Sequence, residues 1–194
     1  MKNISKTILA VLFLLFLQNT YAQNKVVPAV NLGFGFLDGG NKAIRATVGA
    51  NYFITNSIFV GGQIGYSQSD FEVENKDMWY ESQSHFINIP LEAGICLLPS
   101  NKDFDIAPVA GVEFNVGLRS KYNYGMNFMN NSEGGHESIG LKAKTGIGFI
   151  TGVRIHVAGF SINGIYHIPL NDKQKSYFGK KAYPEISLGY ALKI

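Results

Sequence analysis

The sequence predicts an all-β protein, an eight-stranded antiparallel up-and-down transmembrane β-barrel that is preceded by a cleaved signal peptide. Segments in which apolar residues alternate with small or polar ones recur along the chain, and turn residues separate them. The apolar faces of these segments carry no Asp, Glu, Lys or Arg. Charged residues make up only 16% of the chain, which is low for a sheet with one face in water.

The N-terminus has the three parts of a secretory signal peptide, which we predict over residues 1–22. Lys2 and Lys6 give a positive n-region, residues 8–17 form an apolar h-region, and Thr20-Tyr21-Ala22 is the cleavage site. A transmembrane anchor is the alternative, but the apolar run is well short of a membrane span. The chain is therefore expected to be exported.

The mature chain, residues 23–194, is predicted to form a single barrel domain. Removing the two lysines of the leader, which has no acidic residue, lowers the formal net charge from +3 to +1, so nucleic acid is not an expected partner. The single cysteine, Cys96, forms no internal disulfide. The four histidines show no metal-ligand spacing, and neither a metal nor a cofactor is expected.

Eight strands are predicted from the alternation, and no helix is predicted in the mature chain. The strands span residues 29–37, 43–53, 58–67, 85–97, 104–118, 139–157, 160–168 and 185–194. The apolar rows of the first four are Val30, Leu32, Phe34 and Phe36; Ile44, Ala46, Val48, Ala50 and Tyr52; Ile58, Val60, Ile64 and Tyr66; Ile87, Ile89, Leu91, Ala93, Ile95 and Leu97. Those of the fifth, sixth and eighth are Ile106, Ala110, Val112, Phe114, Val116 and Leu118; Leu141, Ala143, Ile147, Phe149, Val153 and Ile155; Ile186, Leu188, Tyr190, Leu192 and Ile194. The seventh strand repeats this scheme.

The apolar rows are predicted to face lipid, and the opposite rows are predicted to line a narrow lumen. A secreted β-sandwich with the apolar rows turned inward is the alternative. Strands of nine or more residues, the length that a tilted strand needs to cross a bilayer, disfavour the sandwich. Pro90 and Pro108 lie within predicted strands, where each removes a ladder donor, so bulges or local breaks are expected there.

The connections between the predicted strands alternate in length. Three are short, at residues 55–57, 99–103 and 158–159, and three on the other side are long, at residues 68–84, 119–138 and 170–184, with a short one at 38–42. Short periplasmic turns and longer extracellular loops are typical of outer-membrane barrels. An even number of strands brings both chain ends to the periplasmic rim.

The charged residues of the inward rows are predicted to form a structural cluster of salt bridges in the lumen. This cluster comprises Arg45, Glu92, Glu113, Lys142, Lys144 and Arg154. A role in proton or ion transfer is the alternative. Eight strands enclose a lumen that side chains fill, so no general pore is expected.

The three long loops carry what the sequence indicates about function. Residues 68–84 carry five acidic residues and one lysine, a net charge of −4, and residues 170–184 carry four lysines and one aspartate, a net charge of +3. Exposed aromatic residues among polar ones are typical of adaptable binding surfaces. The candidates are Trp79, Tyr80, Tyr122, Tyr124 and Phe128. We favour the interpretation in which these residues extend the barrel above the bilayer or belong to its aromatic girdle.

Three stretches carry a resemblance to a known family. HFINIPLEAGICL, residues 85–97, resembles the aromatic-x-x-Ile-Pro-Leu strand of the outer-membrane β-barrel domain family common in Bacteroidota, which includes PorT-like and OmpA-like small barrels. FDIAPVAGVEFNVGL, residues 104–118, is similar to that family's Pro-x-x-Gly-x-Gly strand, with Val112 and Glu113 where a second Gly is common. Residues 146–172 are similar to its Gly-rich strand, tight turn and following strand. The chain departs from the pattern by ending in Ile194 instead of an aromatic residue.

The resemblance implies an integral outer-membrane protein. We expect it to have a structural or surface-interaction role, to be monomeric and to contact outer-membrane lipid, with an extracellular or envelope protein as a candidate partner. We expect no catalysis. An accessory barrel subunit of a protein-secretion machine is one alternative. A lipid A-modifying enzyme is another, because small barrels of this size include such enzymes. Its candidate residues would be His85 near Ser84, the run His136-Glu137-Ser138, and His167.

Overall fold

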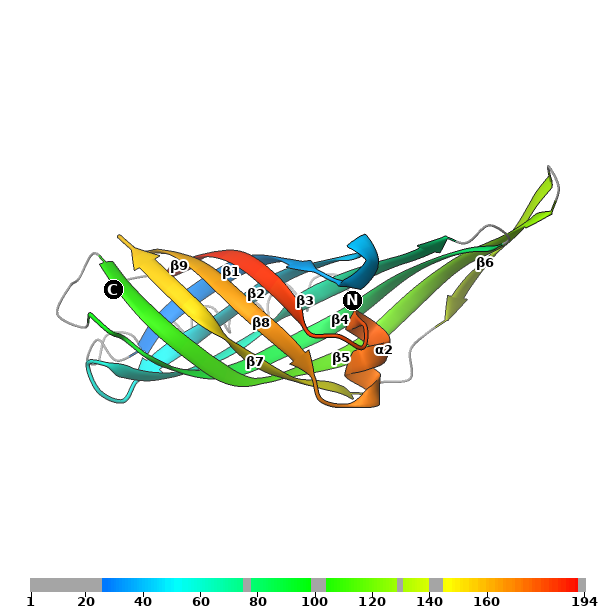
Figure 1. Ribbon diagram of the computed structural model, residues 1–194. Helices are drawn as coiled ribbons and strands as arrows, with labels where there is room; N and C mark the ends of the chain where they lie inside the picture. The colour runs from blue at the N-terminus through cyan, green and yellow to red at the C-terminus, as the bar shows by residue number, and fades with distance from the viewer. Residues whose placement is uncertain (1–25, 75–77, 99–103, 129–130, 140–144, 192–194) are drawn as a thin grey trace, which may run out of the picture.

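The computed structural model describes residues 26–74, 78–98, 104–128, 131–139 and 145–191. Almost all of these residues lie in strands (Figure 1). The strands are β1 (Val26–Phe36), β2 (Lys42–Phe53), β3 (Ile58–Glu74), β4 (Met78–Ile95), β5 (Phe104–Phe128), β6 (Asn131–Ile139), β7 (Thr145–Val157), β8 (Phe160–Pro169) and β9 (Tyr183–Ala191). Two short helices, η2 (Asp38–Gly40) and α2 (Asp172–Phe178), lie between strands.

Eight of the strands close into an antiparallel barrel. The order around the barrel is β1, β2, β3, β4, β5, β7, β8 and β9, and β9 pairs back with β1 from Ala29 opposite Ala191 to Gly35 opposite Glu185. Each strand pairs with the strand that follows it around the barrel. The predicted eight-stranded antiparallel barrel is therefore confirmed.

Side chains of opposite character occupy the two faces of the barrel. Leu32 and Leu188 on the outward face are 68% and 62% exposed, whereas Asn163 on the inward face is 2% exposed. The members of the predicted apolar rows that lie within the described ranges face outward, and Arg, Glu, Asn and Ser side chains are buried within the barrel. This polarity is the reverse of that of a water-soluble domain, and it is the one that a lipid environment requires.

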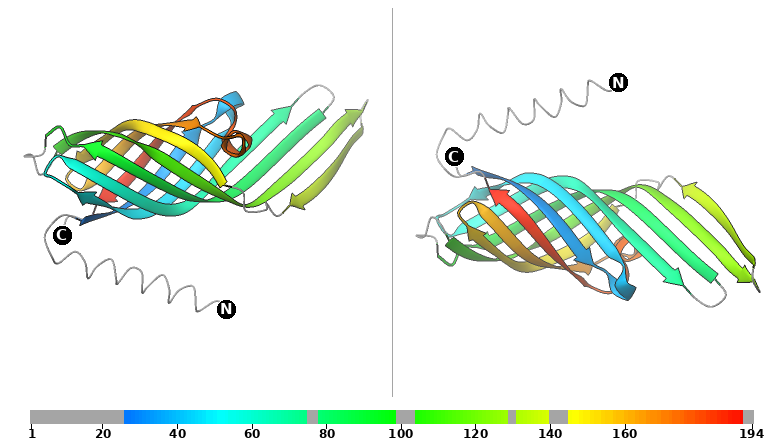
Figure 2. Two further views of the ribbon diagram at one scale, coloured as in Figure 1. Left: turned by 90° about the horizontal axis from the view of Figure 1, so that it is seen from below. Right: turned by 90° about the horizontal axis from the view of Figure 1, so that it is seen from above.

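Three barrel strands continue beyond one rim and form an additional sheet (Figure 2). We call this part the outer sheet: residues 71–74 of β3, 78–84 of β4, 120–128 of β5, and β6. Residues 71–74 pair with 79–82, residues 78–84 pair with 120–126, and residues 120–128 pair with β6. The prediction of long loops at 68–84 and 119–138 was therefore wrong. Where a strand extends beyond the bilayer, both of its faces meet water. Its sequence then lacks the uncharged apolar row by which the barrel strands were predicted.

Several predicted boundaries also change. The sixth predicted strand, residues 139–157, divides in two, because Ile139 ends β6 opposite Ser120 and the barrel strand β7 begins at Thr145. Lys142 and Lys144 lie outside the described residues, as do the predicted signal peptide and Ile194.

The expectation that the mature chain has no helix was wrong. Asn171 begins α2 by accepting a hydrogen bond from the Gln174 backbone N–H at 2.9 Å, and Gly179 ends it at a φ of 93°, which favours glycine. Seven residues make two turns, which is too short to show helical periodicity in the sequence. Within the described ranges, no helix has the length and apolar character needed to cross a membrane.

Helix α2 plugs the mouth of the barrel below the outer sheet (Figure 1). Its buried Tyr177 and Phe178 pack against Phe86 of β4, with ring centroids 4.6 and 5.1 Å apart. Tyr183 and the partly buried Phe71 belong to the same apolar cluster. A second apolar cluster lies near the opposite rim and contains Phe59, Cys96, Ala107 and Val109.

Pro90 interrupts the pairing of its strand as expected, whereas Pro108 stays paired, and neither proline lies at a bulge. Opposite Pro90, the ladder between β3 and β4 lapses between the pairs Gly62–Leu91 and Gly65–Asn88 and resumes in the same register, so the expected local break is present. Pro108 remains paired with Val153 and lies just beyond the last pair of the β4–β5 ladder. The register shift of β4 against β5 occurs elsewhere, between His85 and Phe86.

The packing of the plug predicts a large effect of truncating Phe86, which is fully buried. Phe86→Ala should lower the free energy of unfolding by about 3–5 kcal/mol, because the cavity cannot be filled by the ring residues of α2. Urea unfolding of the protein in detergent, followed by tryptophan fluorescence, measures this. Leu170→Ala, a truncation of an exposed side chain, is the control and should cost less than about 1 kcal/mol. Equal costs for the two variants would contradict the packing argument.

Candidate functional site

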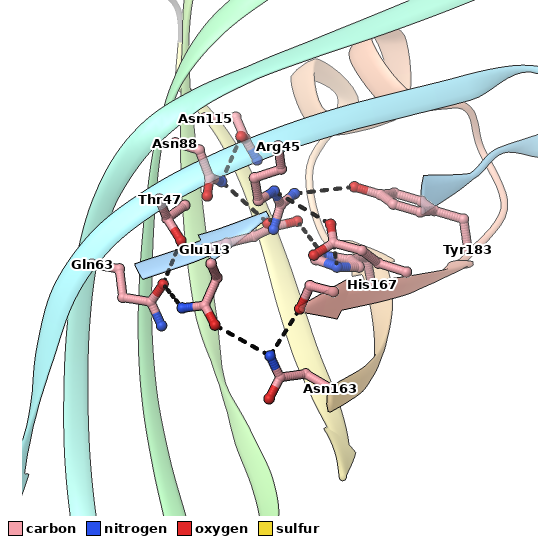
Figure 3. A network of polar contacts seen from close by, with 12 residues as sticks. Arg45, Thr47, Gln63, Asn88, Glu113, Asn115, Asn163, His167 and Tyr183 are labelled. Atoms are coloured by element: carbon pink, nitrogen blue, oxygen red, sulfur yellow. Dashed lines mark hydrogen bonds and ion pairs between the residues drawn. The ribbon is translucent and has the colours of Figure 1, made fainter. Parts of the chain in front are cut away.

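The lumen contains a cluster of ionic groups from four strands near the plug (Figure 3). Strand alternation points Arg45 of β2, Glu113 of β5, His167 of β8 and Glu185 of β9 inward, and each is at most 7% exposed. Arg45 Nη2 lies 3.0 Å from Glu113 Oε2, and its Nε lies 3.4 Å from Glu185 Oε2. His167 lies between the two carboxylates, with Nδ1 3.1 Å from Glu113 Oε1 and Nε2 3.4 Å from Glu185 Oε2. We call these four residues the upper cluster.

The upper cluster is joined directly to the plug. Gln174 of α2 donates a hydrogen bond to Glu113 Oε1 at 2.8 Å and accepts one from Asn115 at 3.1 Å. The His167 ring stacks on Tyr183 with centroids 4.7 Å apart, and Tyr183 stacks on Phe178 at 5.6 Å. The plug is thus fixed by both apolar packing and hydrogen bonds to buried charge.

A second ion pair lies deeper in the lumen. Arg154 Nη2 of β7 is 2.5 Å from Glu92 Oε1 of β4, and Arg154 Nε donates to Asn163 Oδ1 at 3.0 Å. The guanidinium also lies over the Phe59 ring, 5.6 Å from its centroid. We call Arg154 and Glu92 the lower pair.

Neutral polar side chains connect the lower pair to other strands. Gln63 donates to Glu92 at 3.4 Å and accepts hydrogen bonds from Thr47 at 2.5 Å and Asn31 at 2.9 Å. Asn163 donates to Ser187 Oγ at 2.9 Å (Figure 3). Side chains of β1, β2, β3, β4, β7, β8 and β9 thus take part in one hydrogen-bonded belt, which is how polar groups away from bulk water are accommodated.

A small cavity of about 40 Å³ lies between the upper cluster and the lower pair. Its lining includes Arg45, His167, Glu185, Glu92 and Arg154. Arg45 Nε and His167 Nε2 border it, and among the described groups neither makes an aligned hydrogen bond. The volume admits only a few water molecules, so this space can hydrate the charges but cannot take an organic substrate.

The charges of the upper cluster and the lower pair balance when His167 is protonated. The upper cluster and the lower pair together hold three carboxylates and two guanidinium groups. An imidazolium at His167, with a carboxylate facing each ring nitrogen, makes the set neutral. Buried ions that are paired in this way hold a fold in one arrangement, and removing one partner is costly.

The structure places four of the six predicted lumen charges inside the barrel. Arg45 and Glu113 are in the upper cluster, whereas Glu92 and Arg154 form the lower pair, so they make two groups and not one. The sequence analysis did not assign Glu185 to the lumen, although it shares the polar row of the last strand with Ser187. It treated His167 only as a catalytic candidate. No sequence pattern indicated Gln174, because its partners are distant in the chain.

The candidate aromatic residues lie on strands of the outer sheet and not in loops. Trp79 and Tyr80 are on β4, and Tyr122, Tyr124 and Phe128 are on β5. Tyr80 is directly opposite Tyr124, which is 48% exposed. The side chains of Tyr122 and Phe128 are outside the described part of the structure.

The histidine candidates for catalysis have separate environments. Ser84 is buried and its hydroxyl pairs with Ser120 at 2.6 Å, whereas the adjacent His85 contacts the Tyr66 hydroxyl through Nδ1 on the outward face. His167 is in the upper cluster, and His136 lies on β6 opposite Asn123. In the described ranges, no group of three or more His, Cys, Asp or Glu side chains could hold a metal ion.

The interaction within the lower pair can be measured by comparing the unfolding of single and double variants. Glu92→Leu alone or Arg154→Met alone should each lower the free energy of unfolding by about 3–5 kcal/mol, because each leaves an uncompensated buried charge. The double variant should lose less than either single variant. Urea unfolding in detergent measures all three. A double variant that loses the sum of the two single costs would show that the pair does not interact.

Comparisons with known proteins concern the fold. No family model matches the chain, and no curated protein matches it. It is similar to the N-terminal β-barrel domain of Pseudomonas aeruginosa OprF, with 13% identity and a TM-score of 0.41, covering 88% of this chain and 98% of that one. It is also similar to Ail, the attachment invasion locus protein of Yersinia pestis, with 14% identity, a TM-score of 0.39, and 86% and 96% coverage. A third similar structure is the outer membrane enzyme PagL, with 12% identity, a TM-score of 0.43, and 86% and 99% coverage. At these identities the likeness assigns no residue role to this chain.

Proposed function

We propose that this protein is an integral outer-membrane β-barrel that neither conducts nor catalyses, and that its outer sheet interacts with an extracellular or envelope protein. The observation that carries the proposal is the contrast between the two parts of the chain. The barrel lumen is filled and plugged, whereas the outer sheet extends well past the rim without contributing to barrel closure.

The outward face of the barrel supports the membrane location. Exposed large apolar side chains occur on all eight barrel strands, among them Val48, Ile64, Leu91, Val153 and Ile162, each between 44% and 54% exposed. In water such a continuous apolar surface would aggregate. In a bilayer it is the expected surface of a barrel whose backbone groups are paired around its circumference.

The connections support one orientation. Both ends of the barrel sheet, Val26 of β1 and Ala191 of β9, lie at the rim of the tight turn at residues 158–159. The outer sheet and α2 lie at the other rim. Because barrels have short periplasmic turns and long extracellular segments, the outer sheet is assigned to the extracellular side.

The placement of the polar residues supports a role without catalysis or conduction. A hydrolytic or acyl-transfer site needs a nucleophile beside its base, and the Ser84 hydroxyl and His85 ring point to opposite faces of β4. His167 is enclosed by two carboxylates and Tyr183. The same enclosed groups obstruct the lumen.

The edge of the outer sheet supports binding of a protein. Strand β6 pairs with β5 along residues 120–128, and it is at the end of the strand order in the described sheet. An edge strand offers backbone donors and acceptors to an added strand of a partner. An accessory subunit of a secretion machine would use such an edge, and this form of the proposal is the alternative we retain.

The location and orientation are tested by cysteine labelling of intact cells. Asn123→Cys on the outer sheet should react with a membrane-impermeant maleimide, whereas Asn56→Cys in the turn at the opposite rim should react only after lysis. Both variants also carry Cys96→Ser, so that the buried Cys96 thiol does not contribute to the labelling. Labelling of Asn56→Cys alone in intact cells would invert the orientation, and recovery of the protein in the soluble fraction would overturn the membrane location.

The filled lumen predicts an absence of conductance. The purified protein in planar lipid bilayers should give no stepwise ion currents at 100 mV, because the plug and the ionic groups occupy the path. A barrel that retains its gel shift between unboiled and boiled samples, and that nevertheless produces regular open steps, would contradict the proposal of a non-conducting barrel. That gel shift is the control for correct folding.

A further inference from the structure

The outward face of the strands changes from apolar to polar and charged at one level, where the barrel meets the outer sheet. Tyr66, Ile87 and Val116 make the last predominantly apolar row across β3, β4 and β5. The next row contains Gln68, His85 and Arg119, and the one after it contains Asp70, Gln83 and Lys121. A tyrosine at such a boundary is typical of the aromatic girdle at a membrane surface.

A β-bulge turns Arg119 to the outward face. Phe86 is opposite Gly117 and His85 is opposite Arg119, so Leu118 is the extra residue in β5. Leu118 and Arg119 are therefore both exposed in succession, and Ser120 is buried again. Bulges commonly redirect a side chain in this way. Here the bulge places an apolar side chain and a cation side by side at the boundary.

His85 completes the arrangement from the neighbouring strand. Its ring stacks on Tyr66 with centroids 5.9 Å apart and contacts the Tyr66 hydroxyl through Nδ1. With the tyrosine hydroxyl as donor, His85 Nε2 carries its hydrogen and can donate to another group. Lys121, Arg119 and Asp70 are all within electrostatic reach of this ring.

The acidic neighbour of His85, Asp70, lies on β3, on the side of His85 away from β5. Asp70 on β3 accepts from Gln68 Nε2 at 3.1 Å and lies opposite Lys42 of β2. Two strand spacings, roughly 10 Å, separate β3 from β5. Glu72 and Glu81 lie one row farther from the membrane. The two cationic side chains of these rows, Arg119 and Lys121, are therefore both on β5.

We propose that His85, Arg119 and Lys121 bind the phosphate of a lipid headgroup in the outer leaflet. We call these residues the boundary cluster. The inference rests on the proposed outer-membrane location, because the position of the cluster matters only if lipid covers the adjacent apolar rows. Guanidinium and ammonium groups recognise phosphate oxygens by charge-assisted hydrogen bonds, and the neighbouring Leu118 contacts the acyl chains of the same lipid.

The test titrates the full-length protein in non-ionic detergent with lipid A, and native mass spectrometry counts the bound lipid. The variants are Arg119→Gln/Lys121→Gln and a control of equal charge change, Lys173→Gln/Lys180→Gln, whose lysines are exposed beside the plug. Wild type and control should bind lipid A and discriminate against its dephosphorylated form. The boundary variant should bind roughly 20-fold more weakly, because two cations near an anionic headgroup are lost.

Several results would overturn the inference. These are unchanged binding by the boundary variant, an equal loss in both variants, displacement by inorganic phosphate, and tighter binding of a soluble anionic polysaccharide. The gel shift between unboiled and boiled samples distinguishes failure of the lipid-binding inference from failure of the proposed membrane barrel. A wild-type protein that shifts but ignores lipid A overturns only the boundary cluster, whereas one that does not shift overturns the membrane barrel.

Discussion

Closure of eight strands around a narrow lumen is the constraint on which the rest of the structure depends. Such a lumen is just wide enough for side chains, so each inward polar group needs a partner within the barrel. The upper cluster and the lower pair meet this need for their charged groups, and amide side chains such as Asn31 and Gln63 form hydrogen bonds between them. Small residues provide the space. A side chain at Gly33 would collide with the Glu185 carboxyl group, so the absence of a side chain there is part of the ion cluster.

The plug and the outer sheet are mechanically connected at the same rim. Ser69 donates to the Tyr177 carbonyl at 2.8 Å, and Phe71 packs against the apolar cluster that contains Phe178. The root of the outer sheet is thereby attached to α2, and α2 is attached to Glu113 through Gln174. A partner that binds the outer sheet would meet a surface with a rigid base. The lumen network thus supports the rim as well as the barrel wall.

The barrel could be predicted from the sequence, whereas the parts of the chain outside the bilayer could not. The uncharged apolar rows identified eight barrel strands and their lipid-facing sides, because lipid excludes charge from one face over the whole crossing. The same criterion failed for the ends of β3, β4 and β5, where charged residues such as Glu72 and Glu81 lie on paired strands in water. It also missed α2, whose seven residues are specified by the Asn171 cap and by tertiary packing. The partners of His167 and Gln174 come from other strands, which residue spacing alone does not reveal.

The chain positions of the upper cluster have a consequence for assembly. Arg45 is on the second barrel strand, whereas His167 and Glu185 are on the last two, so the cluster joins the two ends of the sheet across the seam between β1 and β9. In an open sheet, Arg45 would lack its contact with Glu185 and could pair only with Glu113 or face the hydrocarbon interior. Closure of the seam therefore brings Arg45 to its partner Glu185 on β9. A barrel closed in a shifted register would bring a different residue of β9 to Arg45, and this ion pair would be lost.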